Sequence, residues 1–414
     1  MRNSAKILSA NVLAQVFALG VYPFISRIYT PADFGLFQLF MSIGGVLTIV
    51  ATADYFNAIV LPKEQEKGVA CFHVGFICLL ITTAICVLSV CFKQELSLLF
   101  KTPELTSVYP LMPIYVFIIP CWYLVSYWYT REKKFSEIAR YQVGQSALNS
   151  LSKYGFGIEA VGGGLVIATV FAPVVALLIS VFTHFKKTLR PLFVFNKELC
   201  RETAIEYRNF PKYSLPKTLI NYINSNLPIL LLTPIFGISQ IGFWGMALTL
   251  AFRPINMISG SLYQVFYQQT AERVNNKQSI GGFFKKFVNS TLLLILPTFA
   301  MLYFILPWLV KFLLGAGWES TATLIQFMLP WLVVCLINAT INYLVDVFGK
   351  QKANMWIEVA RSISTVSVLL IGSEVGNFHS TMLCFCASQF LFSAGQIIWY
   401  LSLVNTYEKR LKAQ

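Results

Sequence analysis

The chain has 414 residues, of which 56% are hydrophobic and only 12% are charged. Soluble domains carry about 25% charged residues, and a soluble core could not enclose this much apolar surface. The net charge of +14 is spread over short segments between apolar runs. That distribution is a membrane topology signal and argues against a nucleic-acid-binding surface. The composition therefore excludes a soluble globular protein and predicts a polytopic membrane protein.

Apolar runs long enough to cross a bilayer, which needs roughly 20 mostly apolar residues, recur along the whole chain. In chain order we predict transmembrane helices over 7–28, 35–61, 69–92, 108–130, 137–157, 163–184, 216–236, 240–268, 286–314, 322–348, 353–373 and 378–404. The first run lacks a small-residue cleavage site and continues for a full span, so we interpret it as a helix and not as a cleavable signal peptide. The run 137–157 is the weakest because it contains several amides and a lysine.

The basic residues predict the orientation of these spans. With the N-terminus in the cytoplasm, five of the 32 Lys and Arg residues fall in the opposite loops: Arg27, Lys93, Lys101, Lys153 and Lys311. Three lie inside predicted helices: Lys217, Arg253 and Arg361. All the others are cytoplasmic, as the positive-inside rule requires. The pattern predicts an all-α membrane protein of about twelve transmembrane helices with both termini in the cytoplasm.

The longest hydrophilic stretch divides the chain into two halves. We predict an N-terminal six-helix lobe over 1–185, a cytoplasmic linker over 186–212 and a C-terminal six-helix lobe over 213–414. A faint repeat supports this division: Asp33-Phe34-Gly35-Leu36-Phe37 opens the second helix, and Gln240-Ile241-Gly242-Phe243-Trp244 opens the eighth, 207 residues later. Both helices start from the same side of the membrane, so this would be a parallel repeat, as in several transporter folds.

Several predicted helices carry polar side chains at helical spacing, although an unpaired polar group is costly in hydrocarbon. The simpler interpretation of any one of them is a hydrogen bond between helices, worth roughly 0.6 kcal/mol. Six such stripes spread over both lobes favour a shared water-filled cavity. The candidate cavity residues are Gln145, Asn149, Lys153, Lys217, Asn221, Arg253, Asn256, Asn342 and Arg361.

The charged members of these stripes are the strongest candidates for function. An Arg at a helix centre costs ~2.5–3.5 kcal/mol on insertion scales, so Arg253, beside Pro254 in mid-span, is functional by default. Two alternatives stay open for the others. Glu358 and Arg361 are three residues apart and could pair with each other, and Lys217 could extend to the membrane interface.

No motif for covalent chemistry stands out. There is no Walker-type phosphate loop and therefore no sign of an ATP motor, and neither H-E-x-x-H nor G-x-S-x-G occurs. Most of the nine cysteines lie within or at the ends of apolar runs, without disulfide or zinc spacing. We therefore predict no catalytic residue, no metal site, no cofactor and no enzyme activity.

Short motifs spread over essentially the whole chain resemble bacterial polysaccharide-unit flippases of the Wzx type. They are Ser9–Gln15, Ser26–Phe37, Ala58–Pro62, Tyr207–Pro216, Asn226–Leu232, Gly317-Trp318 and Gly349–Lys352. Each motif is short, and their order and spacing carry the resemblance. Relatives often have an Arg and a Glu just before the Ala-Ile-Val-Leu-Pro segment, where this chain has Asp54-Tyr55-Phe56-Asn57. The role of those charges is therefore not carried over to this chain.

The resemblance implies the fold of the multidrug/oligosaccharidyl-lipid/polysaccharide exporter superfamily. It also implies a substrate, an oligosaccharide on an undecaprenyl pyrophosphate carrier, that is flipped from the cytoplasmic to the periplasmic leaflet of the bacterial inner membrane for O-antigen or other polysaccharide synthesis. A polysaccharide polymerase and a chain-length regulator would be its partners. The residues fit this independently, because a pyrophosphate needs cations such as Arg253, Arg361 and Lys217, while amides suit sugar hydroxyls.

We expect alternating access by rocking of the lobes, driven by an ion gradient. Asp54, Glu358 and Asp346 are the candidate ion-coupling residues. The main alternative is an ion-coupled multidrug exporter of the same superfamily. A membrane polymerase or ligase is a second, although that class usually needs a sizeable periplasmic loop with catalytic residues, and a lipid-linked peptidoglycan-precursor flippase is a third.

Overall fold

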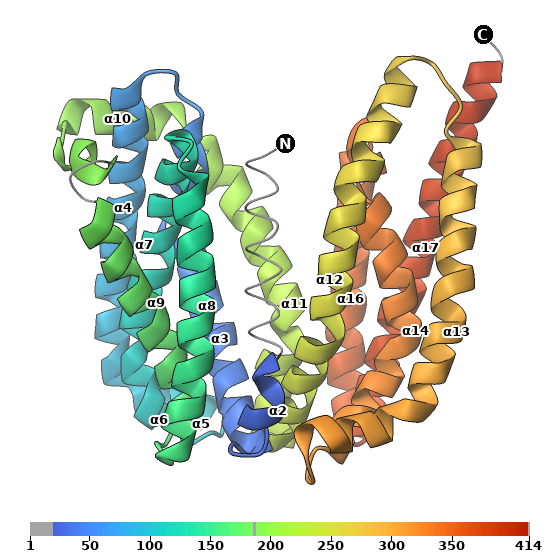
Figure 1. The fold of residues 1–414 in the computed structure, drawn as a ribbon, viewed down its shortest axis with the longest axis horizontal. Helices are drawn as coiled ribbons and strands as arrows, with labels where there is room; N and C mark the ends of the chain where they lie inside the picture. The colour runs from blue at the N-terminus through green and yellow to red at the C-terminus, as the bar shows by residue number, and fades with distance from the viewer. Residues whose placement is uncertain (1–19, 185–187, 413–414) are drawn as a thin grey trace. The chain divides into compact units, whose positions relative to one another are not determined.

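The computed structural model describes residues 20–184 and 188–412. These residues form helices joined by short turns, with no β-strand among them (Figure 1). The first half of the described chain contains α2 (Tyr22–Ile25), α3 (Pro31–Ala51), η1 (Tyr55–Val60), α4 (Gln65–Ser89), η2 (Val90–Phe92), α5 (Lys93–Leu99), α6 (Leu105–Val108), η3 (Tyr109–Leu111), α7 (Met112–Arg131), α8 (Phe135–Ile158) and α9 (Gly164–His184). The second half contains η5 (Arg190–Phe193), α10 (Lys197–Glu206), η6 (Phe210–Ser214), α11 (Leu215–Phe236), α12 (Ile238–Asn275), α13 (Gly281–Leu314), α14 (Glu319–Ile341), α15 (Leu344–Val347), α16 (Gln351–Val375) and α17 (Phe378–Lys412).

Ten helical segments in the described part of the chain are long and apolar enough to cross a membrane. They correspond to all the predicted runs except 7–28 and 137–157. The run 137–157 is present as the helix α8, but its composition is too polar for it to be counted among the ten. The run 7–28 lies mostly outside the described residues, so the predicted first span stays a prediction.

Large apolar side chains cover the outside of these helices. On α13, Leu293 is 78% exposed and Phe304 is 81% exposed, and on α9 Phe182 is 79% exposed. A soluble monomer rarely shows contiguous apolar surface of this extent. Helices satisfy their own backbone hydrogen bonds, so such a surface is stable in lipid. The chain is therefore a multi-pass membrane protein, as the composition predicted.

The chain forms two compact units, Met1–Gly242 and Phe243–Gln414. In the first unit, α4 packs against α7 and α10, α8 packs against α9, and α11 packs along α3. In the second unit, α14 packs against α13 and α17, and α16 packs against α17. The first unit includes α11 because that helix lies along α3. The predicted division into lobes at 186–212 stays a prediction.

The helix α3 is shorter than the predicted apolar run 35–61. It begins with a capping box, in which the Asp33 amide donates to Thr30 Oγ1 (3.3 Å) and the Thr30 amide donates to Asp33 Oδ2 (2.8 Å). It ends at Ala51, and two successive residues after it, Ala53 (φ 46°) and Asp54 (φ 64°), are left-handed. Non-glycine residues rarely adopt this conformation, and it stops a helix. Hydropathy cannot detect the break, because the residues around it remain apolar.

Candidate functional site

Residues 52–57, the turn after α3 together with the first residues of η1, bury a carboxylate; we call this segment the Asp54 turn. Asp54 is only 5% exposed. Its Oδ1 accepts a hydrogen bond from Asn57 Nδ2 at 2.7 Å, while its Oδ2 is buried without a hydrogen-bond partner among the described residues. The same holds for Thr52 Oγ1. Buried polar atoms are nearly always paired, so these two oxygens mark a place where a further ligand could be held.

Aromatic and main-chain contacts fix the Asp54 turn in place. The Phe56 ring lies 5.6 Å from that of Tyr123 and 4.9 Å from that of Tyr127, both on α7. On the other side, the Tyr55 hydroxyl donates to the carbonyl of Ala204 in α10 at 3.0 Å. Strained backbone persists where surrounding contacts determine it, and such turns are frequent at functional sites. The turn is therefore held rigidly between α7 and α10.

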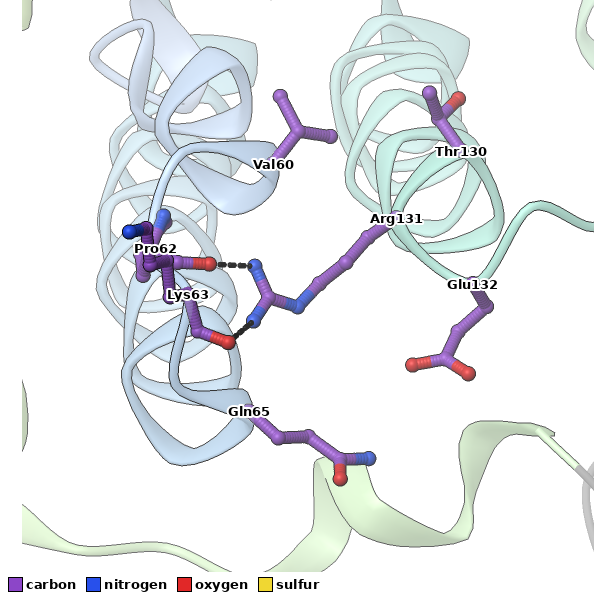
Figure 2. A pocket seen from close by; sticks show the side chains of 7 residues that line it. All are labelled: Val60, Pro62, Lys63, Gln65, Thr130, Arg131 and Glu132. Carbon is purple, nitrogen blue, oxygen red and sulfur yellow. Dashed lines mark hydrogen bonds between the residues drawn. The ribbon is translucent and has the colours of Figure 1, made fainter.

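Arg131, at the end of α7, is a basic residue that the sequence analysis did not single out. Figure 2 shows its side chain reaching across to the segment that precedes α4. The guanidinium donates to the carbonyls of Ile59 (2.9 Å), Pro62 (2.6 Å) and Glu64 (2.8 Å). A Cβ at Gly68 would lie 2.7 Å from its Cζ, so a larger residue at this position would displace the guanidinium.

An open cavity of about 440 Å³ adjoins this arginine (Figure 2). It is lined by Val60, Pro62, Lys63, Gln65, Thr130, Arg131 and Glu132. The guanidinium donates its hydrogen bonds to main-chain carbonyls, so we assign Arg131 a structural role. No sequence pattern could have found this role, because main-chain acceptors leave no signature in side-chain chemistry.

The polar stripe of α8 contains three of the predicted cavity residues, spaced at i, i+4 and i+8. Lys153 is only 9% exposed, and its Nζ lies 4.4 Å from the centre of the Phe37 ring on α3. Such a cation–π contact lowers the cost of burying an ammonium group. Asn149 is half-buried, with its Oδ1 lacking a hydrogen-bond partner among the described residues, and Gln145 is also half-buried. The structure therefore places one stripe on the inside of the first unit.

Two further predicted residues of the first unit lie on the first turns of α11. Lys217 and Asn221 are both exposed. The carbonyl of Asn221 accepts a hydrogen bond from the Ser225 hydroxyl at 2.9 Å. Their side chains are thus open to their surroundings, unlike Lys153.

In the second unit, polar side chains from α14, α16 and α17 join in what we call the α16–α17 network. It comprises Asn338, Asn354, Glu358, Arg361, Thr365, Gln389 and Gln396. Glu358 Oε1 accepts from Gln396 Nε2 at 2.6 Å, and Gln396 Oε1 accepts from Asn338 Nδ2 at 2.7 Å. Arg361 Nε donates to Gln389 Oε1 at 2.7 Å. Arg361 Nη1 lies 3.9 Å from Glu358 Oε2, so the two charges do pair, as one alternative predicted.

Gln389 and Gln396 are the residues of this network that sequence reasoning missed. Both side chains are buried, at 4% and 3% exposed. The sequence alone does not show whether an amide on an apolar helix faces inward or outward. The signal was present in the sequence: Gln389, Ser393 and Gln396 recur at i, i+4 and i+7 in the run 378–404, which places them on one face of α17. An apolar recess of about 370 Å³ adjoins Gln396 and is lined by Ile357, Leu391, Phe392, Gly395 and Gln396 itself.

The remaining predicted residues of the second unit lie on α12, α14 and α15. Arg253 is half-buried in α12 directly before Pro254, and Asn256 is exposed on the same helix. Asn342 is exposed at the end of α14. Asp346 in α15 is exposed, and its Oδ1 accepts from Gln351 Nε2 at 3.2 Å. Asp346 therefore lies at the surface, beside the first turn of α16.

Solved structures with the same arrangement of helices are transporters. A multidrug-resistance transporter of the MATE family, described as a member of the MOP superfamily and inward-facing, has a TM-score of 0.71 at 13% identity, covering 95% of this chain and 96% of its own. The lipid II flippase MurJ, in an inward closed conformation, has a TM-score of 0.74 at 13% identity, covering 99% and 91%. The MATE transporter VcmN of Vibrio cholerae, in a bent form, has a TM-score of 0.54 at 14% identity, covering 98% and 96%. The fold is that of the MOP transporter superfamily.

The family follows from the sequence. Residues 24–323 match the family of polysaccharide biosynthesis proteins. Because this match spans most of the chain, the protein belongs to that family, which agrees with the predicted resemblance to Wzx-type flippases. The search of curated protein sequences gave no match.

Proposed function

We propose that this protein flips undecaprenyl-pyrophosphate-linked oligosaccharide repeat units from the cytoplasmic to the periplasmic leaflet of the bacterial inner membrane. The product would feed O-antigen, capsular or exopolysaccharide synthesis. The observation that carries the proposal is the membership in the polysaccharide biosynthesis family, joined to a fold shared with a lipid II flippase. In a chain built of membrane-spanning helices, a transport step in polysaccharide synthesis is the function that fits both.

The physical task is to move a charged, hydroxyl-rich head group through a layer that excludes it. Polar groups inside the bundle lower that barrier, while the isoprenoid tail remains in lipid. Arg253 is the leading cation for the pyrophosphate, because it is half-buried near the middle of α12, directly before Pro254, where an arginine is costly unless it has a function. Lys153 is the second candidate, since it is buried on an inward polar stripe. Asn149 and Gln145 on that stripe suit sugar hydroxyls.

Ion coupling is proposed at Asp54 in preference to Glu358 or Asp346. The Glu358 carboxylate already accepts a hydrogen bond from Gln396 and pairs with Arg361, so it is engaged within the α16–α17 network. Asp346 is exposed. Asp54 is buried, and its Oδ2 has no hydrogen-bond partner among the described residues, so this oxygen is available to bind a coupling ion.

The first test is the position of the lipid-linked oligosaccharide in a strain that lacks the gene. We expect the oligosaccharide to accumulate on the cytoplasmic face, with loss of surface polymer, and the intact gene to restore both. Units stranded on the periplasmic face would instead indicate a polymerase or ligase. Loss of viability through depletion of peptidoglycan precursors would indicate a flippase of those precursors.

The second test addresses the residues. In vesicles, Arg253→Ala is expected to slow flipping at least tenfold, while Arg140→Ala, at an exposed position on α8, is expected to leave the rate unchanged. Full activity of Arg253→Ala would remove its role in pyrophosphate binding. Asp54→Asn is expected to abolish the response of flipping to an imposed ion gradient. A wild-type rate that is independent of every imposed gradient would remove the coupling role.

An ion-coupled multidrug exporter is the second candidate function, favoured by the fold shared with MATE transporters. It predicts altered drug sensitivity and normal surface polymer in the strain that lacks the gene. The same strain therefore distinguishes the two functions.

A further inference from the structure

Three consecutive large apolar residues are exposed in the hydrophilic segment that follows α9. Phe193 is 67% exposed, Val194 is 71% exposed and Phe195 is 58% exposed; we call residues 193–195 the apolar tip. The side chain directly before them, Leu192, is buried. A run of three or more exposed apolar residues is unfavourable in water and marks a contact surface. The tip therefore requires an apolar surrounding that the described residues do not supply.

Contacts with the first unit fix the main chain at the apolar tip. The Trp128 indole on α7 donates to the carbonyl of Thr188 at 2.9 Å. His73 Nε2 on α4 donates to the carbonyl of Leu192 at 2.7 Å. The Phe195 ring lies 5.3 Å from the His73 imidazole. The tip therefore holds a defined place beside α4, and its exposure is a feature of the folded chain.

The position of His73 on α4 shows what surrounds the apolar tip. Ile77, Ile81 and Ile85 follow His73 at intervals of four residues, so all four side chains lie on one face of the helix. The three isoleucines are exposed, and α4 belongs to a segment apolar enough to cross a membrane, so this face lies against lipid. At 1.5 Å per residue, the tip is anchored about 6 Å along the helix axis from the first of these isoleucines. The tip therefore continues the lipid-facing surface of α4 at the edge of the bilayer.

Basic residues flank the apolar tip. Arg190 lies three positions before it and Lys197 two positions after it, and both are exposed. Segments that combine apolar and basic side chains lie in the membrane interface, where anionic lipid head groups attract the basic ones. The outward face of α10, just beyond, carries Glu198, Arg201 and Glu202, which mix charges of both signs. The combination of apolar and basic side chains is thus confined to the tip and its two flanking residues.

We propose that the apolar tip inserts into the head-group region of the membrane, on the side where α4 begins, and that Arg190 and Lys197 bind the phosphates of anionic lipids there. With the predicted topology this is the cytoplasmic leaflet. The docking holds the segment between α9 and α10 against lipid and not in solvent. It needs only the tip and the lipid-facing side of α4, so it is independent of the substrate that the protein moves.

A fluorophore on the apolar tip tests the insertion. In the full-length chain with the nine native cysteines replaced, Val194→Cys carries an environment-sensitive dye, and the protein is reconstituted in vesicles of phosphatidylcholine and phosphatidylglycerol. We expect nitroxide-labelled lipid to quench the dye. Aqueous iodide should quench it at least about fivefold less than a dye on Glu202→Cys, the matched control on the outward face of α10, because the tip is buried among head groups. Equal iodide quenching at the two positions would overturn the proposal.

The same dye tests the choice of lipid. Replacing Arg190 and Lys197 by alanine together is expected to lower the ratio of docked to undocked tip about fivefold for each charge removed. Arg140→Ala, which removes an exposed arginine paired with Glu137, is the control and should leave the ratio unchanged. Equal protection of the tip in vesicles of phosphatidylcholine alone would overturn the assignment to anionic lipid. Folding of every variant is verified from its unfolding temperature in detergent.

A second measurement needs no substitution. Amide hydrogen exchange of the native chain is compared in nanodiscs of phosphatidylcholine with and without phosphatidylglycerol. We expect residues 193–196 to exchange more slowly with the anionic lipid, while the amides of α10 exchange alike in both. Unchanged exchange at the apolar tip would overturn the proposal. Neither measurement contains lipid-linked oligosaccharide, so failure of the tip to dock leaves the proposed function standing, and failure to flip that substrate leaves the docking standing.

Discussion

The two compact units accommodate a carboxylate among apolar helices in opposite ways. In the second unit, Glu358 is paired with Arg361 and accepts a hydrogen bond from Gln396, so its charge is compensated. In the first unit, Asp54 has a single hydrogen-bond partner, Asn57, and sits on strained backbone. Buried charges are tolerated when paired, and unpaired ones are expensive. The comparison indicates that Glu358 belongs to a stabilising network, while Asp54 stays the candidate for the ion-coupling role proposed above.

The largest effect is expected from removing Arg131, which holds the segment after the Asp54 turn. Arg131→Ala removes the hydrogen bonds that fix the segment after the turn, and it leaves the carbonyls of Ile59 and Pro62 unpaired. Because hydrogen bonds from a charged donor contribute ~1.5–3 kcal/mol each, we expect the free energy of unfolding to fall by about 3 kcal/mol. Denaturant titration in detergent micelles measures this. Arg140→Ala, which removes an exposed ion pair with Glu137 (3.0 Å), is the control and should cost under ~0.5 kcal/mol. Equal losses for the two variants would contradict the assignment.

The next largest effect is expected from a substitution that disrupts the α16–α17 network of the second unit. Gln396→Leu keeps the side chain roughly the same size but removes the donor to Glu358 and the acceptor for Asn338. We expect the free energy of unfolding to fall by about 2 kcal/mol, since unsatisfied buried polar groups cost ~1–3 kcal/mol. Gln351→Leu is the control, because Gln351 is exposed and makes one surface hydrogen bond. If the two substitutions shifted the unfolding midpoint alike, the network would carry no stability.

A smaller effect is expected at Glu408 in the second unit. Like Arg131 in the first unit, this charged side chain binds main-chain groups of another segment, but its charge is negative. Glu408, near the end of α17, accepts from the amides of Ile280 (2.7 Å) and Gly281 (2.8 Å) at the start of α13. Glu408→Ala should cost about 1 kcal/mol, the usual size of a lost helix cap. Lys409→Ala, at the exposed neighbouring position, is the control. Amide hydrogen exchange at the start of α13 reports the loss locally, and unchanged protection there would rule out the cap.

The smallest expected effect concerns strain in the Asp54 turn. Ala53 has a φ of 46°, which costs a residue with a side chain about 1 kcal/mol and costs glycine nothing. After the greater flexibility of glycine in the unfolded chain is counted, Ala53→Gly should stabilise the protein by roughly 0.5 kcal/mol. Ala58→Gly, in the helical η1, should instead destabilise it by about 1 kcal/mol. Destabilisation by Ala53→Gly of the same size would show that the turn stores no strain.

Sequence patterns reached some site residues and missed others for identifiable reasons. The spacing of Glu358 and Arg361 allowed their pairing to be anticipated, because residues three apart lie on one helix face. The amides of Gln389 and Gln396 had the right spacing too, but their burial depends on which face of α17 meets α14 and α16. Arg131 was out of reach, because its acceptors are carbonyls exposed by a turn some 70 positions away in sequence.

The sequence by itself determined that the protein is surrounded by lipid, that it is helical, and where nearly all of its spans lie. It could do so because the length of an apolar run and the periodicity of its residues are local properties. It also indicated the family through the order of its short motifs. Only the tertiary structure decided that α3 stops at Ala51, that Asp54 is buried with an unpaired oxygen, and that Gly35 and Gly242 lie against each other's helices. These features depend on contacts between segments far apart in the chain, where the energy of close packing, and not local preference, selects the conformation.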